Sequence, residues 1–178
     1  GAPKAMLLEG YVWDIAEGPA LAKKAAEIAR TNGTAVALSL SDSFCVERHR
    51  DSFIDFVRND ADIIVADEEE VFALLGTDSI IDTLEALPNH GKLFVMTRSE
   101  KGSVIVHKDQ KIVKPAFAVD EVVDTTGAGD AYCAGFLYGW AIERPLDECA
   151  RYGTHCATMV IQQLGARIEP GLLDDFES

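Results

Sequence analysis

Apolar runs of strand length alternate with helix-like stretches along most of this chain. The strand-like runs cover residues 5–11, 34–40, 61–66 and 92–97. Helical character covers residues 19–31, 46–58, 68–75, 79–87, 128–142 and 146–163. Strands that are separated by helices pair in parallel, because the helix returns the chain to the same end of the sheet. The pattern therefore predicts an α/β fold with a mostly parallel sheet and helices on its faces.

Two further strand-like segments, 102–107 and 111–115, flank the polar turn Lys108-Asp109-Gln110. So short a connection joins antiparallel strands, which predicts a hairpin near one edge of the sheet. The 178 residues are 48% hydrophobic, enough for one substantial core. No apolar run has the length of a membrane-spanning helix. We therefore expect a single cytoplasmic domain that does not insert into membranes.

The formal net charge of −14 opposes binding to nucleic acids or to anionic membranes. It does not oppose a nucleotide, which local N–H groups and helix dipoles hold within a pocket. The four cysteines, Cys45, Cys133, Cys149 and Cys156, lack the Cys-x-x-Cys and histidine spacings that are typical of zinc sites. We interpret them as reduced thiols without a chemical role.

The sequence Asp124-Thr125-Thr126-Gly127-Ala128-Gly129-Asp130 leads directly into a small, apolar helix-like stretch. Its glycines let the backbone approach an anion, and the first turn of a helix offers free N–H groups. A carboxylate on either side suits a site in which one acid accepts a proton and the other lies near a cation. A tight turn with an aspartate near a helix start is the alternative for a bare Gly-x-Gly. The full pattern favours phosphate chemistry.

These seven residues and the helix after them resemble the C-terminal signature of ribokinase-like carbohydrate and nucleoside kinases, the phosphofructokinase-B type family. The resemblance implies a three-layer αβα fold that uses ATP, Mg²⁺ and, in many members, a monovalent cation such as K⁺. It implies that Asp130 is the catalytic base and that the amides of Gly127, Ala128 and Gly129 stabilise the transferred phosphoryl group. Asp124 and Thr126 match positions beside the monovalent cation.

The family also carries an Asn-x-x-Glu motif that helps to position Mg²⁺. Here Asp67 stands where asparagine is expected, and Glu70 matches the glutamate. The two acids could bind metal or could cap the helix that follows them. Thr97, Ser99 and Gly102 resemble the family segment that runs beside the nucleotide, although a surface turn would use the same residue types.

Near the C-terminus, Thr154 and Gly165 lie where family members surround the adenine and complete the cation site. Gly165 would also serve as an ordinary helix stop. The resemblance covers residues 1–178 but corresponds only to the C-terminal nucleotide-binding and catalytic portion of a member. The N-terminal part supplies much of the substrate pocket and a lid that often mediates dimerisation. We expect the chain to be a fragment of a longer kinase and inactive by itself.

The resemblance implies transfer of the γ-phosphoryl group of ATP to a hydroxyl of a nucleoside or a sugar. Residues 8–14 and 39–46 are similar to bacterial members described as adenosine kinases or sugar kinases, which favours adenosine. A sugar kinase such as a ribokinase or fructokinase is the alternative. An alternative of another class is a catalytically silent nucleotide-binding module, against which the presence of both Asp124 and Asp130 argues.

Overall fold

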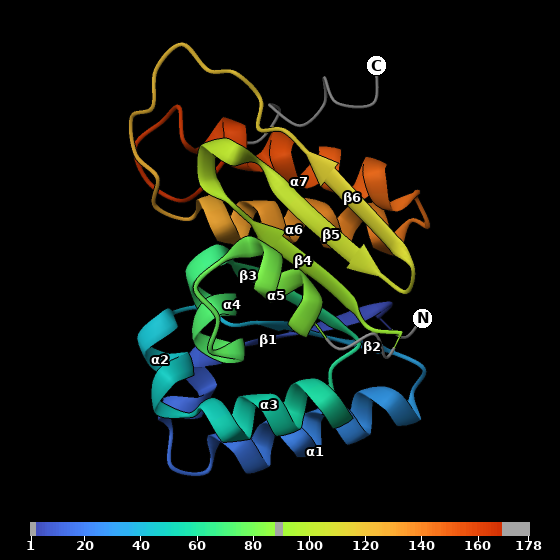
Figure 1. Cartoon of the computed structure of the whole chain (residues 1–178). Helices are drawn as coiled ribbons and strands as arrows, with labels where there is room; N and C mark the ends of the chain where they lie inside the picture. The colour runs from blue at the N-terminus through green and yellow to red at the C-terminus, as the bar shows by residue number, and fades with distance from the viewer. Residues whose placement is uncertain (1–2, 88–90, 169–178) are drawn as a thin grey trace. The chain divides into compact units, whose positions relative to one another are not determined.

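The computed structural model describes residues 3–87 and 91–168, which belong to two compact units. Unit 1 is Gly1–Val113 and unit 2 is Lys114–Ser178, and each is described by itself (Figure 1). No helix in the described ranges is both long and apolar enough to cross a membrane.

Unit 1 is built on a mixed sheet of six strands whose spatial order follows the chain, from β1 to β6. The pairs β1–β2, β2–β3 and β3–β4 are parallel, whereas β4 and β5 are antiparallel. A two-residue turn, Lys108-Asp109, joins β5 to β6. The strands are β1 Ala5–Glu9, β2 Ala35–Ser39, β3 Ile63–Asp67, β4 Leu93–Thr97, β5 Ser103–His107 and β6 Gln110–Lys114. The predicted parallel sheet with a hairpin at one edge is confirmed.

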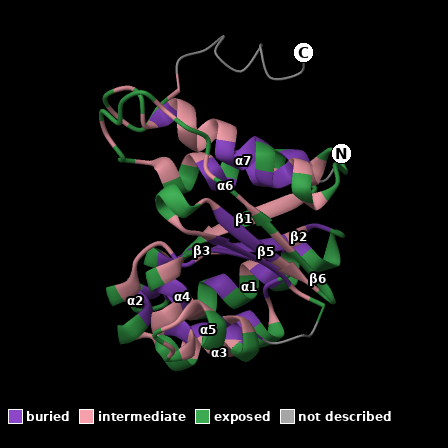
Figure 2. Ribbon diagram, turned by 45° about the horizontal axis from the view of Figure 1, so that its top comes forward, coloured by how far each residue is buried: buried purple, intermediate pink, exposed green. Residues whose placement is uncertain are grey.

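The helices of unit 1 connect the parallel strands and lie together on one face of the sheet (Figure 2). This placement follows from the strand order, because right-handed crossovers between successive neighbours all fall on the same side. The helical segments are η1 Gly10–Asp14, α1 Gly18–Thr31, α2 Ser43–Arg48, α3 Arg50–Asn59, α4 Glu68–Leu75, α5 Ile80–Ala86 and η2 Ser99–Lys101.

The core of unit 1 lies between this helical layer and the sheet. Alternate strand residues such as Val36, Leu38, Ile64 and Phe94 face it, as the two-residue period of a strand requires. The intervening residues of β3 and β4 are buried as well, so both faces of the central strands are covered. Burial on both faces explains why these strands are almost continuously apolar.

Three predicted elements differ from the structure. The helix predicted over 146–163 ends at Val160. Residue 11 was expected in a strand, but the strand ends at Glu9 and Tyr11 lies in the 3₁₀ helix η1. The chain turns because Gly10 sits so close to the end of β2 that a Cβ there would lie 2.1 Å from the carbonyl oxygen of Leu40. The predicted helix over 46–58 is two helices, α2 and α3, which meet at His49 with a φ of −121° and a ψ of 21°.

Unit 2 contains two long helices, α6 Ala128–Ala141 and α7 Leu146–Val160, which pack closely against each other. Glycines make this approach possible. A Cβ on Gly135 would lie 2.5 Å from the carbonyl oxygen of Tyr152, and one on Gly153 would lie 2.8 Å from that of Tyr132. The helix predicted over 128–142 is rich in small residues. Glycines among them form part of its contact surface with α7.

Candidate active site

The predicted phosphate-binding motif forms the turn that opens α6. Gly127 is the residue before the helix and has a φ of 79° and a ψ of 6°, in the left-handed region that favours glycine. A Cβ on Gly127 would also lie 2.5 Å from the Cβ of Ala166. Backbone conformation and space therefore both require glycine at this position.

The first turn of α6 offers N–H groups to a ligand. The amide of Ala128 donates to Thr125 O at 3.1 Å, and that of Ala131 donates to Gly127 O at 2.9 Å. In the part of the chain that the structure describes, no carbonyl accepts from the amides of Gly129 and Asp130. Gly129 and the carboxylate of Asp130 are both exposed. The turn therefore joins free backbone donors to an accessible carboxylate, as the sequence predicted.

Asp124 fastens this turn to the segment after α7. Its Oδ1 accepts a hydrogen bond from the Thr126 amide at 2.9 Å, and its Oδ2 accepts one from the Gly165 amide at 3.0 Å. Hydrogen bonds from the Thr126 side chain and amide, followed by that from the Gly165 amide, lower the pKa of Asp124. A carboxylate held by donors in this way stays ionised and keeps both loops in place.

Thr154 and Gly165, the other two predicted residues of unit 2, differ in their hydrogen-bond partners. Thr154 is buried in α7 and its hydroxyl donates to Ala150 O at 2.9 Å, within its own helix. Gly165 has a φ of 88° and lies beyond the end of α7, where its amide reaches Asp124. The structure therefore brings Thr126 and Gly165 together at the Asp124 carboxylate.

In unit 1, Asp67 and Glu70 cap the N-terminus of α4. Asp67 Oδ1 accepts from the Glu70 amide at 2.8 Å, and Glu70 Oε2 accepts from the Asp67 amide at 2.9 Å. This reciprocal capping box is one of the two roles that the sequence left open. It uses one oxygen of each carboxylate. Asp67 is exposed, whereas Glu70 is only 8% exposed.

Thr97, Ser99 and Gly102 lie in the connection between β4 and β5. Thr97 pairs in register with Asp67, so this connection begins beside the capping box. Ser99 belongs to η2, and Gly102 follows it with a φ of 86° and a ψ of −131°, which only glycine adopts readily. These three predicted nucleotide-binding residues and the acids Asp67 and Glu70 thus share one end of the sheet.

Two basic side chains from this connection pair with Glu68. Arg98 Nε lies 2.9 Å and Lys101 Nζ 3.4 Å from its carboxylate oxygens. Burial opposes ionisation of Glu68, but the hydrogen bonds and positive charge of Arg98 and Lys101 outweigh it, so the pKa is lowered. The sequence analysis did not predict a role for Glu68. Its only signal there is that Glu68 belongs to the acidic first turn of α4.

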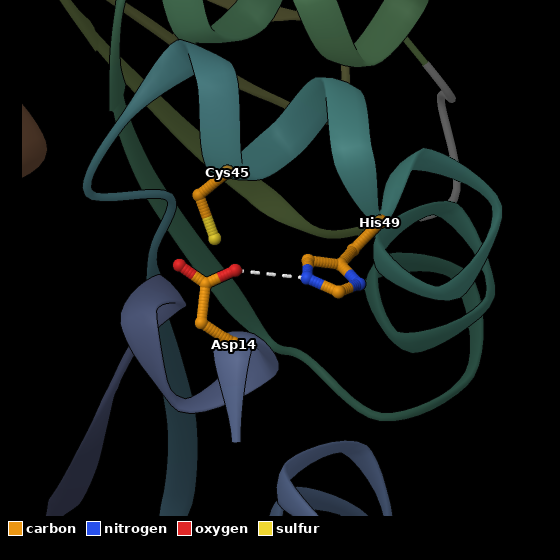
Figure 3. Close-up of side chains that lie close together, drawn as sticks. All are labelled: Asp14, Cys45 and His49. Carbon is orange, nitrogen blue, oxygen red and sulfur yellow. Dashed lines mark hydrogen bonds and ion pairs between the residues drawn. The ribbon is translucent and has the colours of Figure 1, made fainter. Parts of the chain in front are cut away.

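Unit 1 also contains a cluster of polar side chains that the sequence did not predict. Asp14, Cys45 and His49 of unit 1 lie with their ligand atoms all within 4.8 Å of one another (Figure 3). Cys45 and His49 are four residues apart, a spacing that places two side chains on one face of a helix. Asp14 comes from a segment 31 residues earlier in the chain, so spacing alone offered no signal for it.

Known proteins resemble this chain over most of its length. The model of the pfkB family of carbohydrate kinases matches residues 15–171. A cytidine kinase from Thermococcus kodakarensis is 34% identical over 141 residues, which are 76% of this chain and 50% of that protein.

Solved structures agree with this assignment. An adenosine kinase from Sinorhizobium meliloti superposes with a TM-score of 0.93 at 40% identity, over 98% of this chain and 54% of that one. A probable sugar kinase from Rhizobium etli has a TM-score of 0.93 at 37% identity, over 98% and 53% of the two chains. The chain spans about half the length of these relatives. The predicted ribokinase-like αβα fold is confirmed, and the chain belongs to the pfkB family of carbohydrate kinases.

Proposed function

We propose that this chain is the nucleotide-binding and catalytic portion, residues 1–178, of a kinase that transfers the γ-phosphoryl group of ATP to a hydroxyl of a nucleoside, with adenosine as the preferred acceptor. The observation that carries the proposal is the turn before α6. It combines a left-handed glycine, free amides at Gly129 and Asp130, and the exposed Asp130 carboxylate in one helical turn.

Asp130 is the proposed catalytic base. Its carboxylate accepts the proton of the acceptor hydroxyl as the oxygen attacks phosphorus. Phosphoryl transfer depends more on positioning and on charge stabilisation than on early deprotonation, so a carboxylate is an adequate base. The exposure of Asp130 leaves it accessible to an acceptor.

The amides of Gly127, Ala128 and Gly129 are the proposed anion hole. Fixed backbone donors stabilise negative charge that develops on phosphoryl oxygens, and the helix N-terminus adds its positive dipole end. The Ala128 amide already donates to Thr125 O, so the free amides of the first turn carry most of this role. Asp124 supports the turn through Thr126 and Gly165.

Mg²⁺ bound with ATP would neutralise charge on the phosphate oxygens. Asp67 and Glu70 provide the carboxylate oxygens that Mg²⁺ prefers, and both lie at the N-terminus of α4. Thr97, Ser99 and Gly102 are proposed to contact the nucleotide from the same end of the sheet, and Thr154 from α7. A monovalent cation such as K⁺ would bind near Asp124, Thr126 and Gly165.

Similarity to named relatives supports a nucleoside as acceptor. The Thermococcus kodakarensis relative is a cytidine kinase and the Sinorhizobium meliloti structure is an adenosine kinase. A sugar is the second candidate, since the similar Rhizobium etli structure is a probable sugar kinase. No nucleic acid or membrane is proposed as a partner. A homodimer would be formed by parts of the complete protein outside this chain.

The test is ADP formation by the complete protein with ATP, Mg²⁺ and K⁺, offered adenosine, cytidine, ribose or fructose in separate assays. We expect the highest kcat/KM with adenosine. A higher value with a sugar would identify a sugar kinase. ATP binding without turnover on any acceptor would instead indicate a nucleotide-binding module and overturn the proposal.

A further inference from the structure

The Asp14, Cys45 and His49 side chains converge where η1 meets the helical pair α2 and α3 (Figure 3). His49 Nε2 lies 2.9 Å from Asp14 Oδ1. The thiol of Cys45 is fully buried and lies 3.5 Å from the carbonyl oxygen of Gly10. All three residues belong to unit 1, and none takes part in the proposed phosphoryl transfer. Among the described residues, this is the group of histidine, cysteine and acidic side chains that is compact enough to hold one metal ion.

The three ligand atoms are close enough together to share one metal ion after small side-chain movements. Zn²⁺ binds sulfur, nitrogen and oxygen at about 2.0–2.3 Å, so the ligand atoms of a tetrahedral site lie about 3.3–3.6 Å apart. The three ligand atoms here lie within 4.8 Å of one another. Side-chain movements on the order of 1 Å would therefore place all three at bonding distance from one ion.

Two of the three side chains are accessible to solvent, so an ion could reach them from outside. The side chains of Asp14 and His49 are 39% and 31% exposed, whereas Cys45 lies behind them in the core. A divalent cation at this position would neutralise the Asp14 carboxylate and bind the Cys45 sulfur directly as the thiolate.

Arg48 is the competitor for the same carboxylate. Its Nη2 lies 2.7 Å from Asp14 Oδ2, and its side chain is 53% exposed. Arg48 Nε also donates to Asp14 Oδ1 at 3.3 Å, so the guanidinium contacts both oxygens of the carboxylate and a metal ion has to displace it. Because both side chains are partly exposed, water can solvate the released guanidinium. Arg48 therefore provides a cation at this position when no metal ion is bound.

We propose that Asp14, Cys45 and His49 bind a Zn²⁺-class transition-metal ion, with solvent in the fourth coordination position. One thiolate, one imidazole and one carboxylate form a donor set of intermediate softness, which favours Zn²⁺ and Co²⁺ over Mg²⁺. The bound ion would connect η1 to the α2–α3 pair and stabilise unit 1.

The probe is Co²⁺ added to the tag-free, reduced 178-residue chain. A thiolate bound to Co²⁺ produces a charge-transfer absorption in the near ultraviolet, together with visible bands of a four-coordinate ion. We expect both at one Co²⁺ per chain, and we expect Zn²⁺ to displace Co²⁺ and to raise Tm. A folded chain that shows no charge-transfer absorption with Co²⁺ would overturn the proposal.

Matched variants identify the ligands. Cys45→Ser should abolish the charge-transfer absorption, whereas Cys149→Ser should retain it, since Cys149 is also buried and also lies near a carbonyl oxygen, that of Arg144 at 3.3 Å. Loss of a residue that only hydrogen-bonds to a metal ligand typically weakens metal binding by roughly 10–100-fold. His49→Gln removes a direct ligand and should therefore weaken Co²⁺ binding by more than that. His107→Gln, which removes a half-buried histidine elsewhere, should leave the affinity unchanged.

Arg48→Gln distinguishes a metal site from a purely structural cluster. Removing the competing guanidinium should tighten Co²⁺ binding, by up to about fivefold. Arg48 is exposed and His49 is half-buried, so both variants are informative even if Cys45→Ser does not fold. Unchanged Co²⁺ affinity in His49→Gln, or retention of the charge-transfer absorption in folded Cys45→Ser, would overturn the assignment.

Discussion

Asp124 shows how one side chain can connect a turn to a distant segment of the chain. Its two oxygens accept backbone amides from Thr126 and from Gly165, which is 41 residues away in the chain. These hydrogen bonds, with those of Thr126 first, lower the pKa of Asp124 from its ordinary value of 3.8. The ionised carboxylate therefore contributes to the stability of unit 2.

The pH dependence of this contribution follows from the direction of the shift. A carboxyl whose pKa is lower in the folded state stabilises that state above its unfolded pKa of 3.8 and loses this effect as the pH falls through the folded value. Asp124→Asn should therefore destabilise the chain at neutral pH. The difference from the unsubstituted chain should shrink below about pH 4, as measured by urea unfolding at several pH values.

Asp120→Asn is the matched control, because Asp120 is an exposed aspartate in the same segment. It should change the unfolding free energy little at any pH. A destabilisation by Asp124→Asn that stays constant down to pH values near 2 would contradict the role of the charged form.

At the scale of single residues, the sequence predicted a local turn but not the contacts between distant segments. The glycines and acids of 124–130 predicted a turn that opens a helix because their spacing is local, and the structure has that turn before α6. The bond from Gly165 to Asp124 and the approach of Asp14 to Cys45 join distant segments. Such contacts depend on the tertiary fold, and neither helical nor strand periodicity encodes them.

The start of α4 provides a test at the scale of one element. Asp67→Ala removes the acceptor for the Glu70 amide, so we expect a loss of about 0.5–2 kcal/mol in the free energy of unfolding. Asp67→Asn should cost only a few tenths of a kcal/mol, because asparagine caps helices as well as aspartate does. Urea unfolding of the two variants measures the difference. Equal stability of Asp67→Ala and the unsubstituted chain would show that the capping box contributes nothing.

The contact between α6 and α7 makes a second prediction for an element. Gly135→Ala places a methyl group 2.5 Å from the carbonyl oxygen of Tyr152, which the helices can accommodate only by moving apart. We expect a destabilisation of about 1–3 kcal/mol in thermal or urea unfolding.

Ala134→Ser alters the neighbouring, exposed position of the same helix and should stay within about 0.5 kcal/mol. If Gly135→Ala were as stable as Ala134→Ser, the close approach of α6 and α7 would not depend on glycine.

Most elements could be predicted from periodicity, and the exceptions have physical causes. The helices α1, α4 and α6 begin and end close to their predicted bounds. The turn into η1 depends on the close approach of Gly10 to Leu40, and the break at His49 lies within a continuous amphipathic pattern. Local propensity does not detect the turn at Gly10, because a contact with another segment sets it. The break at His49 is a change of backbone conformation at one residue, which the apolar pattern does not record.

For the whole molecule, the fold class was the most predictable property because the alternation of strands and helices extends over most of the chain. The acceptor was the least predictable. Similar relatives are a cytidine kinase, an adenosine kinase and a probable sugar kinase, and the chain spans about half the length of each. Similarity to these relatives supports a kinase of the pfkB family, whereas the choice of acceptor hydroxyl depends on contacts that differ among relatives.

The central claim is that Asp130 acts as the base in phosphoryl transfer. The most direct test compares Asp130→Asn with the unsubstituted complete protein, measuring acceptor-dependent ADP formation at saturating ATP. We expect kcat to fall by a factor of about 10²–10⁴, with the Kd for ATP changed by less than about twofold. Turnover that survives in Asp130→Asn, or ATP affinity that falls in step with activity, would contradict the account.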